Sequence, residues 1–170
     1  MNDAALFDAT VPVFRHYLGR IEALLEERSG PRDALLQRGL APGAFTAAQH
    51  FATALGFPAR TVLPLVGREV PDAGNDVADR TGLLAVASEV RALLESVDAT
   101  DFVGASDRVV RHVAGAAELE QDAATFVTLF AMPNFFFHLA TAFAALRSGG
   151  ADLGKADFDG QHVYAPGFRF

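Results

Sequence analysis

The sequence predicts an all-α fold: a four-helix bundle with one irregular or short hairpin crossover before the last helix. Apolar residues recur at three- and four-residue spacing in four long segments, as in helices that bury one face. A valine-rich stretch between the third and fourth segments breaks this period. Four amphipathic helices with one crossover are typical of a bundle. Because 170 residues is the size of one ordinary domain, we expect a single domain over residues 1–170.

The first helix is predicted from Phe7 to Arg28. Thr10 suits the N-cap, and Pro12 suits an early helical position, where a missing backbone N–H costs nothing. The run Ser-Gly-Pro at 29–31 ends the helical pattern. A short helical turn is expected between residues 31 and 40.

The second helix lies within residues 43–67, where Pro58 and Pro64 interrupt an apolar helical pattern. Proline removes a hydrogen bond and crowds the preceding turn, so we expect a kink near Phe57 and an end near Val66. The third helix covers residues 79–97. Its predicted buried face consists of Leu83, Leu84, Val86, Ala87, Val90, Leu93, Leu94 and Val97.

The crossover covers residues 102–121. Three valines favour extended structure there and the sequence Ala-Gly-Ala at 114–116 can turn, which predicts a small hairpin or an irregular crossing. The last helix should run from about Asp122 to Leu146. The sequence Ser-Gly-Gly at 148–150 is a typical glycine C-cap.

Composition excludes several classes of function. The 15 Phe residues, against two Tyr and no Trp, indicate apolar core packing. The net charge of -7 and the scattered basic residues give no cationic face for phosphates, so we expect no nucleic-acid partner. Without cysteine, the chain has no disulfide, thiolate nucleophile or cysteine-based metal site. The first ten residues lack the pattern of a secretory signal, and we expect a cytoplasmic protein.

Two patterns near the C-terminus suggest functions that we do not expect. Residues 123–146 carry no formal charge and are long enough to span a membrane. Asn134 and His138 near the middle, Pro133, and the absence of a flanking basic cluster argue for a buried bundle helix instead. The sequence at 149–156 matches a GxxxxGK phosphate loop, but a helix precedes it and Ala156 replaces the hydroxyl residue that would hold magnesium.

Four blocks of the chain carry a resemblance to a known family. They are VPVFRHYLGRIEALL at 11–25, LAPGAFTAAQ at 40–49, VGREVP at 66–71 and PNFFFHLATAFAALRSGGADLGKADF at 133–158. In this order they resemble the domain of unknown function family 1993, within the DinB-like superfamily of four-helix bundles. The resemblance covers about residues 8–160 and implies a DinB-like bundle. It implies no settled activity, although some members of the superfamily are thiol-dependent transferases or hydrolases.

Many members of that superfamily bind a divalent metal through three histidines, one on the second helix and an HxxxH pair on the last. His138 matches the first residue of the pair, but Ala142 stands four residues later and cannot ligate a metal. His50 lies in the second helix. We therefore expect no cofactor. The alternative is a degenerate metal-dependent enzyme that uses His50 and His138 with a carboxylate from elsewhere.

The main site candidates lie on the last helix. Asn134 and His138 are four residues apart, so their side chains can touch. One reading is structural: they satisfy each other, or backbone carbonyls freed by Pro133. The other is a small-ligand-binding or interaction module, in which Asn134, His138 and Phe137 contact a small apolar molecule. The sequence identifies no catalytic residue. An exposed apolar stripe on so Phe-rich a bundle would also support a homodimer.

Overall fold

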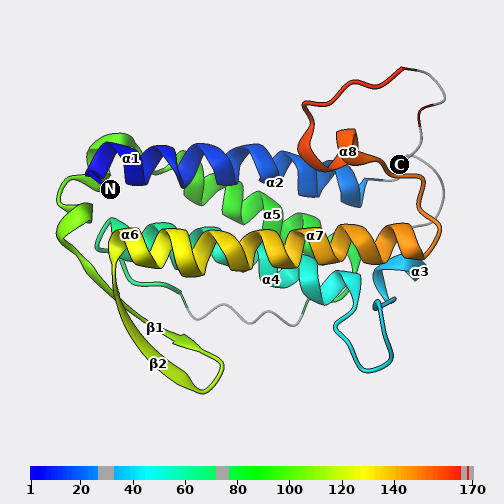
Figure 1. Cartoon of the computed structure of the whole chain (residues 1–170), viewed down its shortest axis with the longest axis horizontal. Coiled ribbons are helices and arrows are strands. Elements are labelled where there is room, and N and C mark those ends of the chain that lie inside the picture. Colours follow the sequence, from blue (N-terminus) through cyan, green and yellow to red (C-terminus); the bar gives the residue numbers. More distant parts are fainter. Residues whose placement is uncertain (27–32, 72–76, 166–167, 169–170) are drawn as a thin grey trace.

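The longest helices run along a common axis and pack side by side (Figure 1). The structure is a computed structural model that describes residues 1–26, 33–71, 77–165 and 168. Within these residues, the helices of at least 15 residues are α2 (Val11–Leu25), α4 (Ala47–Leu65), α5 (Arg80–Glu95) and α7 (Met132–Ser148). α4 packs against both α5 and α7, and α2 packs against α5.

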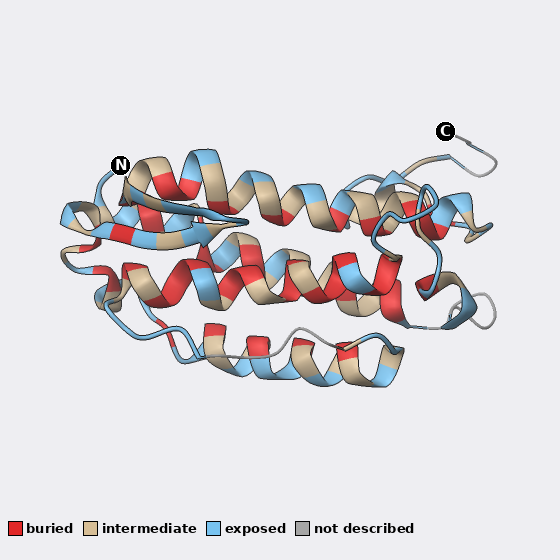
Figure 2. Cartoon of the chain, turned by 90° about the horizontal axis from the view of Figure 1, so that it is seen from below, coloured by how far each residue is buried: buried red, intermediate tan, exposed pale blue. Residues whose placement is uncertain are grey.

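The core fills the space between these helices, and the buried positions in Figure 2 lie mainly on the sides that face a neighbouring helix. Phenylalanine contributes its largest side chains, as the composition predicted: Phe14, Phe51, Phe102, Phe126 and Phe135 are fully buried. The rings of Phe14 and Phe135 join α2 to α7 edge to face, with centroids 5.0 Å apart.

The predicted first helix is divided in two. α1 (Asp3–Asp8) ends before α2 begins at Val11, because Pro12 has no N–H to donate to the preceding turn. The buried hydroxyl of Thr10 donates to the carbonyl oxygen of Leu6 at 2.6 Å, so it closes α1 instead of capping α2. The predicted end at Arg28 and the stop at 29–31 lie outside the described residues.

The middle helices follow the sequence pattern closely. The short turn is α3 (Asp33–Leu36), and α4 ends at Leu65, next to the predicted Val66. Both internal prolines are accommodated within α4, and the kink near Phe57 stays a prediction. In α5, the predicted buried positions Leu84, Val86 and Leu93 are only half-buried, while the others are buried.

The predicted hairpin is present, so the chain is mostly helical and not purely all-α. After two short 3₁₀ turns, η1 (Ala99–Phe102) and η2 (Ala105–Asp107), strand β1 (Val109–Ala114) pairs antiparallel with β2 (Ala117–Asp122). Gly115, with φ of 62°, allows the two-residue turn between them. The hairpin projects beside the helices in Figure 1.

The last helix runs without a break from Ala123 to Ser148, but its geometry changes along the way. α6 (Ala123–Thr125) leads into a π-helical segment, η3 (Phe126–Ala131), and then into α7. Asp122 caps the start by accepting a hydrogen bond from the backbone of Thr125. Of the described helices, this is the one long and apolar enough to cross a membrane, by length and composition alone. The core helix of a soluble protein meets the same length and composition criteria, so these criteria alone do not identify a membrane span.

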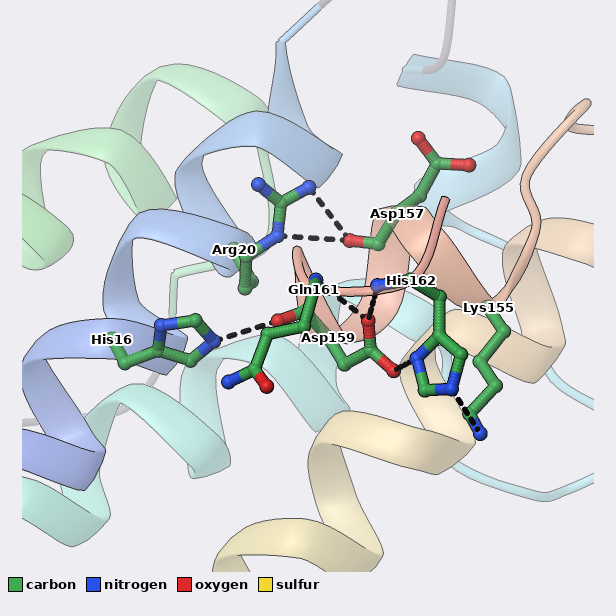
Figure 3. Close-up of polar contacts among 7 residues, drawn as sticks. All are labelled: His16, Arg20, Lys155, Asp157, Asp159, Gln161 and His162. Carbon is green, nitrogen blue, oxygen red and sulfur yellow. Dashed lines mark hydrogen bonds and ion pairs between the residues drawn. The ribbon is translucent and has the colours of Figure 1, made fainter. Parts of the chain in front are cut away.

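The chain beyond the last helix folds back onto α2 (Figure 3). α8 (Lys155–Asp159) packs against α2. Arg20 donates through Nε and a terminal nitrogen to the carbonyl oxygen of Asp157, at 3.0 and 2.8 Å. His16 donates from Nε2 to the carbonyl oxygen of Asp159 at 2.7 Å. These bonds secure the segment to the bundle.

Candidate functional site

α4 holds His50 in its first turn. A capping box defines the start of this helix: the Thr46 hydroxyl accepts from the backbone of Gln49, and the Gln49 side chain accepts from the backbone of Thr46 at 2.8 Å. Because the helix start is held in this way, the direction of His50 is defined as well. The His50 side chain lies inward, and the residue is 6% exposed.

α7 holds His138, and Asn134 lies one helical turn before it. Pro133 follows the π-helical segment η3 and has no N–H of its own to offer. The side-chain amide of Asn134 donates to the carbonyl oxygen of Phe130 at 2.7 Å. The Asn134 side chain thus bonds a backbone carbonyl, but this carbonyl belongs to Phe130, four residues before Asn134, and is not the one that Pro133 leaves free. His138 has a different partner.

His50 and His138 meet between α4 and α7. Their Nδ1 atoms lie 2.9 Å apart, and the ring centroids lie 5.1 Å apart. One Nδ1 must donate a proton and the other accept it, which requires at least one neutral imidazole. The Nε2 atom of each ring takes no part in this bond. The structure therefore brings together the two histidines of the alternative metal-site prediction.

Aromatic rings surround the histidine pair. Phe137 lies 6.0 Å from His50 and 5.2 Å from His138, measured between ring centroids. Phe45 lies 5.6 Å from His50, and Phe57 lies 6.1 Å from His138. Phe45 and Phe137 are 52% and 59% exposed, so the buried His50 and the half-buried His138 have a half-exposed aromatic rim.

Both imidazoles favour the neutral form. Burial lowers the pKa of His138 to about 4, with further contributions from the nearby His50 and Arg60. Burial also lowers the pKa of His50 below its ordinary value. Arg60 is a fixed neighbour: its guanidinium lies 4.6 Å from the Phe57 ring centroid and donates to the carbonyl oxygens of Thr53 and Gly56. At neutral pH the pair is therefore an uncharged hydrogen-bonding group.

Position 142 and the histidines His16 and His112 add no ligand to the His50–His138 pair. Ala142 is fully buried one turn after His138. Within the residues that the structure describes, no group of three His, Cys, Asp or Glu side chains is arranged to hold a metal ion. His16 bonds the segment after α8, and His112 bonds Gln121 on the hairpin at 2.9 Å. The protein thus offers two imidazoles but no third ligand among these residues.

Three residues of this site were not predicted from the sequence: Phe45, Phe57 and Arg60. Phe57 lies seven residues after His50, which is two helical turns, so helical spacing could have placed both on one face of α4. Phe45 precedes the helix, and its position depends on the loop. A separate surface hollow of about 430 Å³ follows the hairpin and is lined by residues 111–113 and 118–120, so it does not include the histidine pair.

The comparison with known proteins agrees with this architecture. The model of the domain of unknown function family DUF1993 matches residues 6–159. The chain belongs to the DUF1993 family. A crystal structure of a DinB family member from Shewanella denitrificans matches 96% of this chain and 96% of its own, with a TM-score of 0.77 and 25% sequence identity. No functionally curated protein matches the chain. The DUF1993 chain therefore shares its fold with a DinB family member.

Proposed function

We propose that this DUF1993 protein is a cytoplasmic DinB-like four-helix bundle that binds a small, mostly apolar molecule at the His50–His138 pair. The observation that carries the proposal is a neutral, hydrogen-bonded imidazole pair inside a half-exposed aromatic rim. Binding sites for small molecules commonly combine apolar walls with a few polar groups that fix orientation. This combination is present between α4 and α7.

The polar groups have distinct roles in the proposal. The neutral imidazoles can present one donor or acceptor each through Nε2, which suits a ligand with a single hydroxyl or ring nitrogen. Phe137 and Phe45 supply aromatic surface at the rim, and Asn134 orients the start of α7 through Phe130. Because the pair carries no charge at neutral pH, it favours a neutral ligand over an anion.

The test uses phenol, indole and benzimidazole as probes, with thermal unfolding and imidazole NMR as the two measurements. Binding should raise the unfolding temperature progressively as the probe concentration rises above its dissociation constant, and should shift the His50 and His138 signals. His138→Ala should abolish most of this stabilisation, and His138→Asn serves as a second variant if alanine impairs folding. His16→Ala, on α2, is the control. Equal stabilisation of the wild type and both His138 variants, or no shift with any probe, would contradict the proposal.

A divalent metal is the second candidate, favoured by the convergence of two imidazoles from different helices. Two nitrogens make an incomplete set for a four-coordinate ion, so water or a bound molecule would have to supply the rest. Metal analysis of protein purified without a His-tag or chelator tests this candidate. A metal content near zero, together with no stabilisation by zinc, nickel or manganese, would remove it and leave the probe experiments unaffected.

A further inference from the structure

The exposed face of the last helix carries a continuous apolar strip. We call it the outer stripe, and it consists of Leu129, Pro133, Phe137, Ala140 and Ala144. Leu129 and Phe137 are 73% and 59% exposed, Pro133 and Ala140 are exposed as well, and Ala144 at the end of the stripe is half-buried. Within α7 the stripe has the alternating four- and three-residue spacing of a helix–helix seam. Other strongly exposed apolar residues, such as Val103 and Val163, lie outside the long helices.

The charges around the outer stripe restrict what can cover it. The chain has a net charge of -7, so two copies repel each other in most orientations. Residues 123–146 contain no Asp, Glu, Lys or Arg, and this uncharged stretch is bounded by Asp122 at one end and Arg147 at the other. Both of these residues are exposed. Opposite charges at the two ends make the helix complementary to itself in the antiparallel direction.

We infer that a second copy of this chain covers the outer stripe, with the two last helices antiparallel about a two-fold axis. When Asp122 lies beside the second copy's Arg147, the register of the two antiparallel helices is fixed. Any two residues that face each other across the axis then have numbers that add up to about 269, as 122 and 147 do. The same register sets Leu129 against the second copy's Ala140, and Pro133 against the second copy's Phe137. Large side chains then face small or flat ones, which lets the helices approach closely. A parallel arrangement would instead set like charges side by side at both ends.

The dimer has a consequence for the candidate site. Phe137 belongs both to the outer stripe and to the aromatic rim of the histidine pair. A second copy that covers Phe137 would exclude water from this side of the rim. The inference does not depend on ligand binding, because the stripe is defined by exposure, spacing and charge alone.

Analytical ultracentrifugation of the full chain tests the inference directly. The wild type should sediment with twice its chain mass of 18.0 kDa at micromolar concentration. Leu129→Glu should raise the dissociation constant at least about 30-fold, as expected when a charge replaces a large apolar residue packed in an interface. Val103→Glu is the matched control, because Val103 is 74% exposed, and it should leave dimerisation unchanged. A monomeric wild type at about 100 µM would overturn the inference, as would equal weakening by both substitutions.

Cysteine cross-linking tests the relative direction of the two helices. Because the native chain has no cysteine, every disulfide must form between introduced cysteines. A mixture of Leu129→Cys and Ala140→Cys proteins should form a disulfide between the two variants faster than either variant forms one with itself. Faster self-linking of each variant would contradict the antiparallel arrangement. Flotation with phosphatidylcholine vesicles tests whether a lipid surface covers the outer stripe instead. A protein that is monomeric in solution and floats with the vesicles would contradict the dimer and favour lipid binding.

Discussion

The imidazoles of His50 and His138 hydrogen-bond through Nδ1 atoms 2.9 Å apart, although 88 residues separate them in the chain. The bond connects the first turn of α4 to the middle of α7, two helices that pack closely along their length. It needs one donor and one acceptor, so it is lost when both rings carry a proton. The contact between these helices is therefore sensitive to pH.

Acidification should lower the free energy of unfolding over a defined pH range. The pKa of His138 is about 4 in the folded protein, against an ordinary value of 6.5. Between these values the unfolded chain binds a proton that the folded chain excludes, so the free energy of unfolding decreases as the pH falls from about 6.5 to about 4. Below about pH 4, His138 is protonated in both the folded and the unfolded protein, so it no longer changes the free energy of unfolding with pH. Urea unfolding at stepped pH measures this dependence.

The double variant His50→Gln/His138→Gln is the control for this prediction, and it should show a flatter pH dependence than the wild type over the same range. Histidine NMR gives an independent check, because His138 should keep the ring signals of a neutral imidazole at pH 5. A titration of His138 near its ordinary value of 6.5 would contradict the lowered pKa.

Ala142→His should restore a metal site at a cost in stability. Ala142 is fully buried, so the larger ring should lower the free energy of unfolding of the metal-free protein by about 1–3 kcal/mol. Residues 138 and 142 share one helical face, so the new imidazole joins the existing pair. Zinc should then raise the unfolding temperature of the variant more than that of the wild type.

Ala142→Gln is the matched control for the metal prediction, because it adds similar bulk without an imidazole. Zinc should stabilise it no more than the wild type. Equal zinc effects on the histidine and glutamine variants would show that position 142 does not complete a ligand set with His50 and His138.

Arg20→Met should loosen the segment after the last helix while leaving the bundle folded. Arg20 makes two hydrogen bonds to the carbonyl oxygen of Asp157, and methionine preserves only the apolar stem. Hydrogen exchange of the α8 backbone should accelerate by roughly tenfold, which corresponds to about 1.4 kcal/mol. Lys155→Met, on the exposed side of α8, should change it less. Unaltered exchange in Arg20→Met would mean that packing alone holds α8.

Much of the helical architecture could be predicted from local pattern. The end of α4, the hairpin turn at Gly115 and the Asp122 start of the last helix follow from capping and turn preferences that act over a few residues. The division at Thr10 was missed because its hydroxyl can cap a following helix or bond a preceding carbonyl. The choice between them depends on how α1 packs, which local sequence does not specify.

Local sequence was enough to indicate the family resemblance, to place the long helices approximately, and to show that alanine occupies position 142, where the resemblance implies a metal-binding histidine. The folded structure was needed to show that His138 pairs with His50 while Asn134 bonds Phe130, and that Phe45, Phe57 and Phe137 surround the pair. The physical reason is that helical periodicity sets which residues share a face of one helix. Which faces meet depends on the rotation and crossing of whole helices, and these follow from packing across the entire core.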